Sequence, residues 1–132
     1  MTGTSMVSVW PAGAERAEVL GAWSQTAPAE PPAGSFHELF AAQARRDPEA
    51  PALVFAGSTV SFGELDARAN RLAHHLRARG AEPETVVAFL LERSVEAVTA
   101  LLAILKTGAA YLPLDPGQPA ERLSRVLADA GA

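Results

Sequence analysis

The stretch Leu105–Leu123 reads "LKTGAAYLPLDPGQPAERL" and decides the fold class. An apolar helix reaches Lys106 and stops at Gly108, because glycine is the usual residue just past a helix end. A short apolar strand follows, and Pro113 within it predicts an edge strand or a strand terminus, since proline gives no N–H to a sheet. Pro119 then suits the first position of another helix. Helix, strand and helix in this order predict an α/β fold.

The residues just before this stretch continue the same alternation. The run "TVVAFLL" (85–91) is apolar without alternation, which is typical of a parallel strand covered on both faces. Ser94 then caps a helix whose many apolar residues predict deep burial. Strand and helix alternate twice in this way, which predicts a largely parallel sheet. The apolar residues of the helix are Val95, Val98, Leu101, Leu102, Ile104 and Leu105.

Two earlier helices begin with the same S-x-x-E capping pattern, Ser35 with Glu38 and Ser61 with Glu64. Between them, "PALVFAGSTVSF" predicts a β-hairpin that turns around Gly57 and Ser58. The first helix should bury Phe36, Leu39 and Phe40 and stop before Pro48. The second should bury Leu65, Ala69, Leu72 and Leu76, present Asp66, Arg68, Arg71, Arg77 and Arg79 to solvent, and end at Gly80.

Residues 1–34 form a separate region in this reading. A short helix would place Val19, Leu20 and Trp23 on one stripe, and a proline-rich linker would follow it. Residues 35–132 supply only two strands of parallel type and one hairpin. Because a parallel sheet needs several strands, the pattern predicts an incomplete sheet and therefore the front of a larger domain.

Composition excludes several functional classes. The net charge of −4 over 132 residues offers no cationic surface for nucleic acid. The absence of cysteine removes disulfides and thiolate metal sites. The apolar run Ala97–Leu105 is much shorter than the roughly 20 residues of a membrane span. No secretory signal is visible, so the sequence predicts a cytoplasmic protein without membrane or nucleic-acid partners.

Few residues invite a chemical role. Lys106 precedes Thr107 and Gly108, but no glycine-rich turn precedes it, so it is interpreted as a lysine at a helix C-terminus rather than a phosphate-binding one. The histidines have no metal-ligand spacing. Asp115 follows a strand, and α/β proteins often bind ligands at the carboxyl ends of their strands. The turn sequence "DPGQP" instead favours an aspartate whose side chain accepts hydrogen bonds from backbone amides. Glu92 also ends a strand, and the two carboxylates cannot be paired from sequence.

Several stretches of the sequence resemble motifs of a known protein family. "LKTGAAYLPLDPGQPAERL" resembles the second core motif of nonribosomal peptide synthetase adenylation domains, and "VSFGELDARANRLAHHLRARG" resembles the first. "FHELFAAQARRDPEAPAL" is similar to the opening of that domain, and the segment from 15 to 32 is similar to the linker that follows a condensation domain. The motif positions are Ser61, Phe62, Glu64, Leu65, Leu105, Lys106, Gly108, Tyr111, Leu112, Pro113, Leu114 and Asp115.

The resemblance implies the first strands and helices of the large N-terminal subdomain of an adenylate-forming enzyme. Such enzymes bind ATP with Mg²⁺, join the carboxylate of an amino acid to AMP, and pass the aminoacyl group to a phosphopantetheine thiol on a carrier domain. In the family the phosphate loop and catalytic residues follow the second core motif, beyond Ala132, and the first two motifs are mainly structural. These 132 residues alone are therefore predicted to bind no cofactor or metal, to supply no catalytic residue and to be inactive.

The implied partners are the rest of the adenylation domain and a carrier domain in a longer chain. Small MbtH-like proteins dock near the second core motif in this family, so Ala109, Ala110 and Tyr111 mark a candidate partner surface. Two alternatives stay open. The chain could be a non-catalytic binding module or a degenerate fragment, or it could belong to another adenylate-forming ligase such as an acyl-CoA or aryl-acid ligase.

Overall fold

The structure, a computed structural model, describes residues 33–132. The leader helix and most of the linker proposed for residues 1–34 lie outside the described residues. Among residues 33–132 no helix has the length and apolar character that a membrane crossing requires. In chain order the elements are α2 (Phe36–Arg46), β1 (Pro51–Phe55), β2 (Ser58–Ser61), α3 (Phe62–Arg77), β3 (Val86–Leu90), α4 (Val95–Thr107), β4 (Ala110–Leu114) and α5 (Ala120–Ala130).

The strands form two separate pairs. β1 and β2 form an antiparallel hairpin, and β3 and β4 pair in parallel from Val86 opposite Ala110 to Leu90 opposite Leu114. The alternation of strands and helices in the sequence is therefore confirmed, and so is the parallel pairing.

The hairpin turn differs by one residue from the prediction. Ala56 and Gly57 form the turn with φ of 48° and 80°, and Ser58 is already the first residue of β2. Two successive positive φ angles match the right-handed twist of the flanking strands, which is why two-residue hairpins favour them. Gly57 takes the second of these positions without strain.

The core lies where α3 packs against α4. Ala69, Ala73 and Ala103 are almost completely buried, and their small side chains let the two helices approach closely. Leu65, Leu102 and Ile104 are the large side chains that are fully buried. The sequence correctly predicted burial for Leu65, Leu102 and Ile104, but Val95, Val98, Leu101 and Leu105 of α4 are only partly buried. Thr99, Ala100, Ala103 and Thr107 are buried instead, and Ala103 packs in one cluster with Ala69 and Ala73 of α3.

The first helix begins at the predicted capping box of Ser35 and Glu38. The Glu38 carboxylate accepts hydrogen bonds from the Ser35 N–H at 2.7 Å and from the Ser35 hydroxyl at 2.8 Å. The backbone bond, followed by the hydroxyl bond, lowers the pKa of Glu38 from its ordinary value. The carboxylate thus closes the first turn of α2 in its ionised form.

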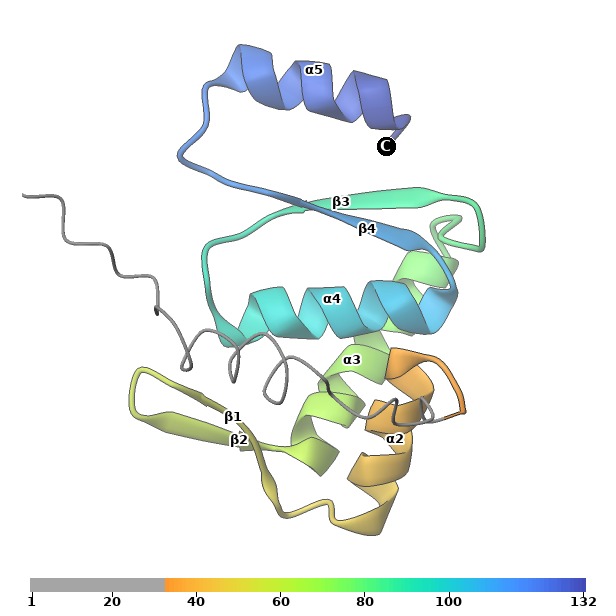
Figure 1. Cartoon of the computed structure of the whole chain (residues 1–132), viewed down its shortest axis with the longest axis vertical. Helices are drawn as coiled ribbons and strands as arrows, with labels where there is room; N and C mark the ends of the chain where they lie inside the picture. The colour runs from red at the N-terminus through yellow and green to blue at the C-terminus, as the bar shows by residue number, and fades with distance from the viewer. Residues whose placement is uncertain (1–32) are drawn as a thin grey trace, which may run out of the picture. The chain divides into compact units, whose positions relative to one another are not determined.

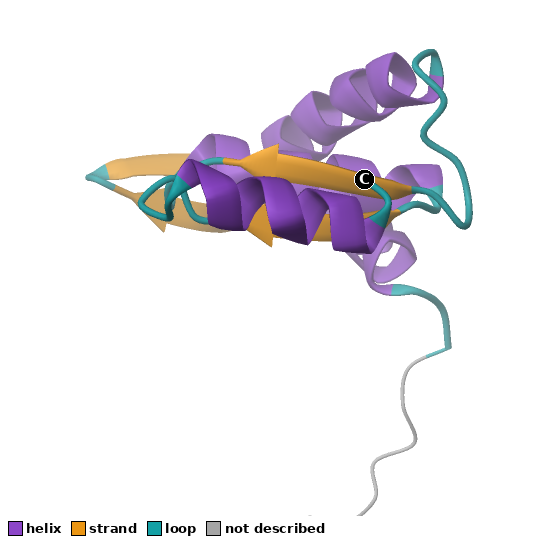
Figure 2. Cartoon of the chain, turned by 90° about the horizontal axis from the view of Figure 1, so that it is seen from above, coloured by secondary structure: helices purple, strands orange, loops and turns teal. Residues whose placement is uncertain are grey.

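The two helices beside the parallel strands lie on opposite faces of the pair. α4 lies on one face and α5 lies across the other, as Figure 1 shows. Figure 2 looks down on α5, which runs along the direction of the strands. No residue of α5 is buried, and its apolar stripe stays partly exposed. The stripe consists of Leu123, Val126, Leu127 and Ala130. The helix begins after Pro119, which is its N-cap rather than its first residue.

Candidate functional site

The second motif is built around the exit from α4. Gly108 ends the helix with φ of 90°, a left-handed conformation that side chains rarely adopt. A Cβ at this position would lie 3.0 Å from Cγ of Pro83, which faces the glycine from the loop before β3. Buried Thr107 donates its hydroxyl to the Ile104 carbonyl and accepts the Ala109 N–H. The motif therefore needs glycine both for its backbone angle and for close packing.

Lys106 has a partner that the sequence did not indicate. Its Nζ lies 2.9 Å from Oδ1 of Asp66 on α3, and the side chains are only 11% and 21% exposed. The guanidinium of Arg77 donates to the backbone carbonyl of Lys106, so a second contact joins the same two helices. Asp66 and Arg77 were predicted to face solvent. Arg77 is exposed as predicted, whereas Asp66 is only partly exposed and holds the last turn of α4 against α3 through Lys106. No local signal could show this pair, because Asp66 and Lys106 are 40 residues apart.

We expect this ion pair to contribute measurably to stability. A double-mutant cycle with Asp66→Asn and Lys106→Met should give a coupling free energy of about 1–3 kcal/mol, between the values for exposed pairs and for buried pairs that lose one partner. Urea unfolding of the four proteins measures it. The exposed Arg68–Glu64 pair on α3, at 2.6 Å, is the matched control and should give about 0.5 kcal/mol or less. Equal coupling for the two pairs would contradict the role assigned to Lys106.

The first motif also serves the fold. Ser61 caps α3 by accepting the Glu64 N–H, and Leu65 is buried beneath it. The ring of Phe62 contacts Phe40 of α2, with 5.3 Å between centroids. The Glu64 carboxylate pairs with Arg68, so its role is local to α3. These contacts join α2, the hairpin and α3 into one unit.

The carboxyl ends of β3 and β4 meet at a shallow cavity of about 360 Å³. Its lining residues are Leu91, Glu92, Arg93, Pro113, Leu114, Asp115 and Pro116. Glu92 and Asp115, which the sequence could not place together, both line it. The Asp115 carboxylate accepts the Gly117 N–H at 2.9 Å, as the turn interpretation predicted. Both residues are exposed to solvent.

The candidate partner surface is only partly accessible. Tyr111 is 44% exposed and Ala110 is exposed, whereas Ala109 is 3% exposed and packs in a small core cluster with Ala81 and Ile104. A protein that binds here would contact Ala110 and Tyr111, with Ala109 beneath them. Within β4, Leu112 and Leu114 are partly buried and Pro113 is exposed.

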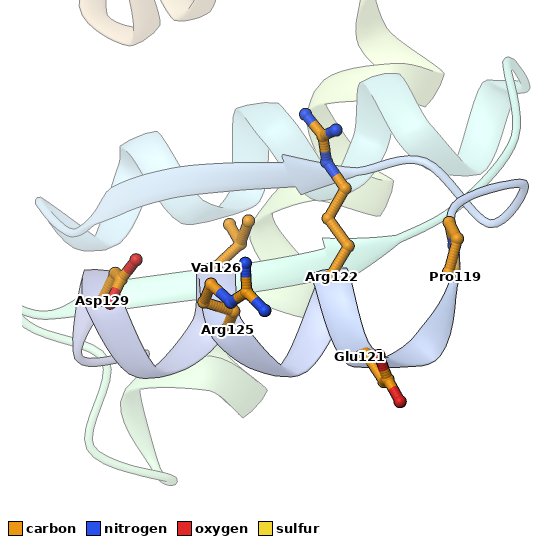
Figure 3. Close-up of a pocket in the computed structure, with 6 residues that line it drawn as sticks. All are labelled: Pro119, Glu121, Arg122, Arg125, Val126 and Asp129. Atoms are coloured by element: carbon orange, nitrogen blue, oxygen red, sulfur yellow. The ribbon is translucent and has the colours of Figure 1, made fainter.

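The other features of the described residues offer no catalytic geometry. An open cavity of about 430 Å³ lies on α5. Figure 3 shows its lining residues, which include Arg122, Arg125 and Asp129. All these residues belong to one surface helix, so no second element completes a site. Residues 33–132 contain no group of three histidine or carboxylate side chains that could hold a metal ion.

Comparison with known sequences gives a consistent result. The sequence model of the family described as "AMP-binding enzyme" matches residues 40–132. Chondramide synthase cmdD of Chondromyces crocatus is 50% identical over 121 residues, 89% of this chain and 3% of that protein. Bacitracin synthase 2 of Bacillus licheniformis is 45% identical over 118 residues, 89% of this chain and 4% of that protein. Phosphinothricin tripeptide synthetase PhsB of Streptomyces viridochromogenes is 49% identical over 123 residues, 90% of this chain and 10% of that protein.

A solved structure shares both sequence and fold. The crystal structure of the nonribosomal peptide synthetase FmoA3, with α-methyl-L-serine-AMP bound, is 43% identical and superposes with a TM-score of 0.74. The superposition covers 79% of this chain and 12% of that one. The chain thus spans between 3% and 10% of the length of the three curated relatives named above.

Proposed function

Since the chain belongs to the family of AMP-binding enzymes, we propose that it forms the N-terminal segment of an amino-acid-activating adenylation domain. The identity of 45–50% to peptide synthetases across 89–90% of the chain carries this proposal. The complete enzyme would join an amino-acid carboxylate to AMP and pass the aminoacyl group to a carrier-domain thiol. The bound α-methyl-L-serine-AMP of FmoA3 supports this reaction class.

We assign no ATP or Mg²⁺ site to the described residues. They contain no group of three histidine or carboxylate side chains that could hold a metal ion, and the backbone around Lys106 ends a helix at Gly108. We therefore assign no step of the reaction to residues 33–132. Their role in the proposal is to hold the first strands of the subdomain in place, through the alanine-lined contact of α3 with α4 and the Lys106–Asp66 pair.

Pyrophosphate exchange tests the proposal. The 132-residue chain should give ATP–pyrophosphate exchange at the buffer background with every amino acid. The synthetase that contains it should exchange at least about a hundredfold faster with its own amino acid, because positioning of the reactants supplies much of the rate in such reactions. Exchange by the chain alone would contradict the scaffold role. Exchange driven only by fatty or aryl acids in the longer protein would instead support another adenylate-forming ligase.

A partner surface at Ala110 and Tyr111 is a further part of the proposal. Their exposure on β4 supports it, and the partner class is a small MbtH-like protein. Ala110→Arg in the synthetase should weaken binding of such a protein by at least about tenfold in a titration, because a long cation would replace a small contact. Exposed Ala67 on α3 gives the control variant Ala67→Arg, which should bind normally. Unchanged binding by both variants would exclude this surface.

A further inference from the structure

Lys106 is the only lysine of the chain, although lysine and arginine together number 11. Its Nζ is therefore the only side-chain amine that an acyl donor could modify. The arginines offer no alternative, because a guanidinium keeps its protons and has no free electron pair with which to attack a carbonyl carbon. The susceptibility of these side chains to acylation thus depends on how accessible one nitrogen atom is.

The cations at the surface are guanidinium groups. Arg71 and Arg79 are exposed on α3, and Arg122 and Arg125 are exposed on α5. The Lys106 side chain, by contrast, is only 11% exposed. The surface of residues 33–132 is therefore charged by groups that do not acylate, while the one amine is withdrawn from solvent.

Asp66 holds the amine in this position. Nζ of Lys106 lies 2.9 Å from Oδ1 of Asp66, whose own side chain is 21% exposed. A lysine attacks a carbonyl carbon only after its nitrogen has lost a proton and turned an electron pair toward the electrophile. Lys106 must therefore leave Asp66 and rotate out of its packed position before it can react. This opening step limits its reactivity.

The backbone that carries Lys106 is also held in place. The guanidinium of Arg77 on α3 donates to the Lys106 carbonyl. The hydroxyl of the next residue, Thr107, donates to the Ile104 carbonyl at 2.7 Å. The last carbonyls of a helix have no partner within the helix, so such bonds oppose fraying of its end. Opening of the amine by fraying would require these bonds to break.

An acyl adenylate is the acyl donor that this amine would meet. In the proposed function the enzyme forms such a mixed anhydride from an amino-acid carboxylate and AMP. A free lysine nitrogen can attack its carbonyl carbon. An amide C–N bond then forms, the bond from that carbon to the phosphate oxygen breaks, AMP leaves with the electron pair, and the nitrogen gives its proton to water.

We propose that the ion pair with Asp66 shields Lys106 from acylation by the aminoacyl adenylate, so that this segment of the synthetase presents no reactive side-chain amine. The inference rests on the proposed function for the identity of the acyl donor. The shielding itself is a property of α3 and α4, so a simple acyl adenylate can measure it. Lys106 would then serve the reaction by being unreactive, in addition to joining the two helices.

Acetylation by acetyl adenylate, followed by peptide mass spectrometry, tests the shielding. We would compare the rate at Lys106 in the folded 132-residue chain with the rate in the same chain unfolded in urea. The folded chain should react at least about tenfold more slowly at this residue, because the amine reacts only from the opened state. Arg71→Lys adds an amine on the exposed side of α3, and that amine should react at similar rates in both states.

Asp66→Asn tests the ion pair directly. It should raise the acetylation rate of Lys106 in the folded chain at least about fivefold, because the neutral amide forms a weaker bond with the ammonium. Glu64→Gln is the matched control, since it removes the carboxylate of the exposed pair with Arg68 on the same helix and should leave the rate at Lys106 unchanged. The same variants are measured in the synthetase that contains the chain, so a variant that unfolds in the short chain is still tested.

The remaining outcomes overturn the proposal or separate it from the function. Equal rates at Lys106 in the folded and unfolded protein would overturn it, and so would an unchanged rate in a folded Asp66→Asn variant. Rapid aminoacylation of Lys106 in a synthetase that catalyses amino-acid-dependent pyrophosphate exchange would reject the shielding while the proposed function stands. Slow acetylation of Lys106 in a protein without that exchange would retain the shielding and reject the function.

Discussion

Leu102→Ala is expected to lower the free energy of unfolding of the chain by about 2–5 kcal/mol. Leu102 is 1% exposed and lies in the cluster that joins α3 and α4, next to Ala69 and Ala73. Its cluster also contains Val60 and Leu65, and side chains packed in this way fill a vacated space only in part. The loss should thus include both the transfer of the side chain and a cavity that stays open. Urea denaturation followed by far-UV circular dichroism measures it.

Leu101 is the matched control on the same helix. It is only partly buried and lines the open apolar surface between α4 and β1, so Leu101→Ala removes atoms that are already near water. We expect Leu101→Ala to lower the free energy of unfolding by less than half as much as Leu102→Ala does. Equal losses at the two positions would mean that the face of α4 toward β1 is as buried as the face toward α3.

Gly108→Ala should lower the free energy of unfolding by about 2–4 kcal/mol. Two penalties add at this position. The first is the left-handed backbone, at φ of 90°, which costs a non-glycine residue about 1–3 kcal/mol. The second is the approach of the new Cβ to 3.0 Å from Cγ of Pro83, which is closer than normal contact and forces the loop before β3 to move.

Gly80 separates these two penalties. It has nearly the same backbone angle, φ of 96°, but no atom lies within 4 Å of the position that a Cβ would occupy. Gly80→Ala should therefore show only the backbone penalty, about 1–2 kcal/mol. The difference between the two alanine variants measures the contact with Pro83. If Gly80→Ala and Gly108→Ala lower the free energy of unfolding equally, Gly108 is required only for its backbone φ angle.

Short-range sequence signals, such as helix caps, were enough to predict most of the helices and strands. Ser61 and Ser94 cap their helices, Gly108 and Gly131 close theirs in the left-handed conformation, and the strands β3 and β4 begin and end close to the predicted residues. These signals depend on neighbouring residues, so they are readable in a sequence. Pro113 was assigned to an edge for the same reason, and the parallel register places it on the outer side of β4.

Contacts between distant segments could not be predicted in this way. Apolar periodicity gave α4 a buried face of large residues, whereas Ala103 is also completely buried because it packs in one cluster with Ala69 and Ala73 of α3. The Lys106–Asp66 pair and the approach of Pro83 to Gly108 depend on how α3 and the loop before β3 are placed. Neither contact produces a recognisable pattern within a short stretch of sequence. The same limit applied to Glu92 and Asp115, whose common cavity follows from the pairing of β3 with β4.

The open edge of β3 has a consequence for synthesis on the ribosome. The contacts of α2, the hairpin, α3 and α4 all lie between residues 36 and 107, so this core can close early, while later segments are still being made. Translation adds about 5–20 residues per second, so the edge of Val86–Leu90 that faces away from β4 stays unpaired while α5 is being made. For that interval the growing protein presents an uncharged, unpaired β edge to its neighbours on the same polysome. Edges of this kind promote aggregation, so recombinant yield should depend on how long this edge stays uncovered.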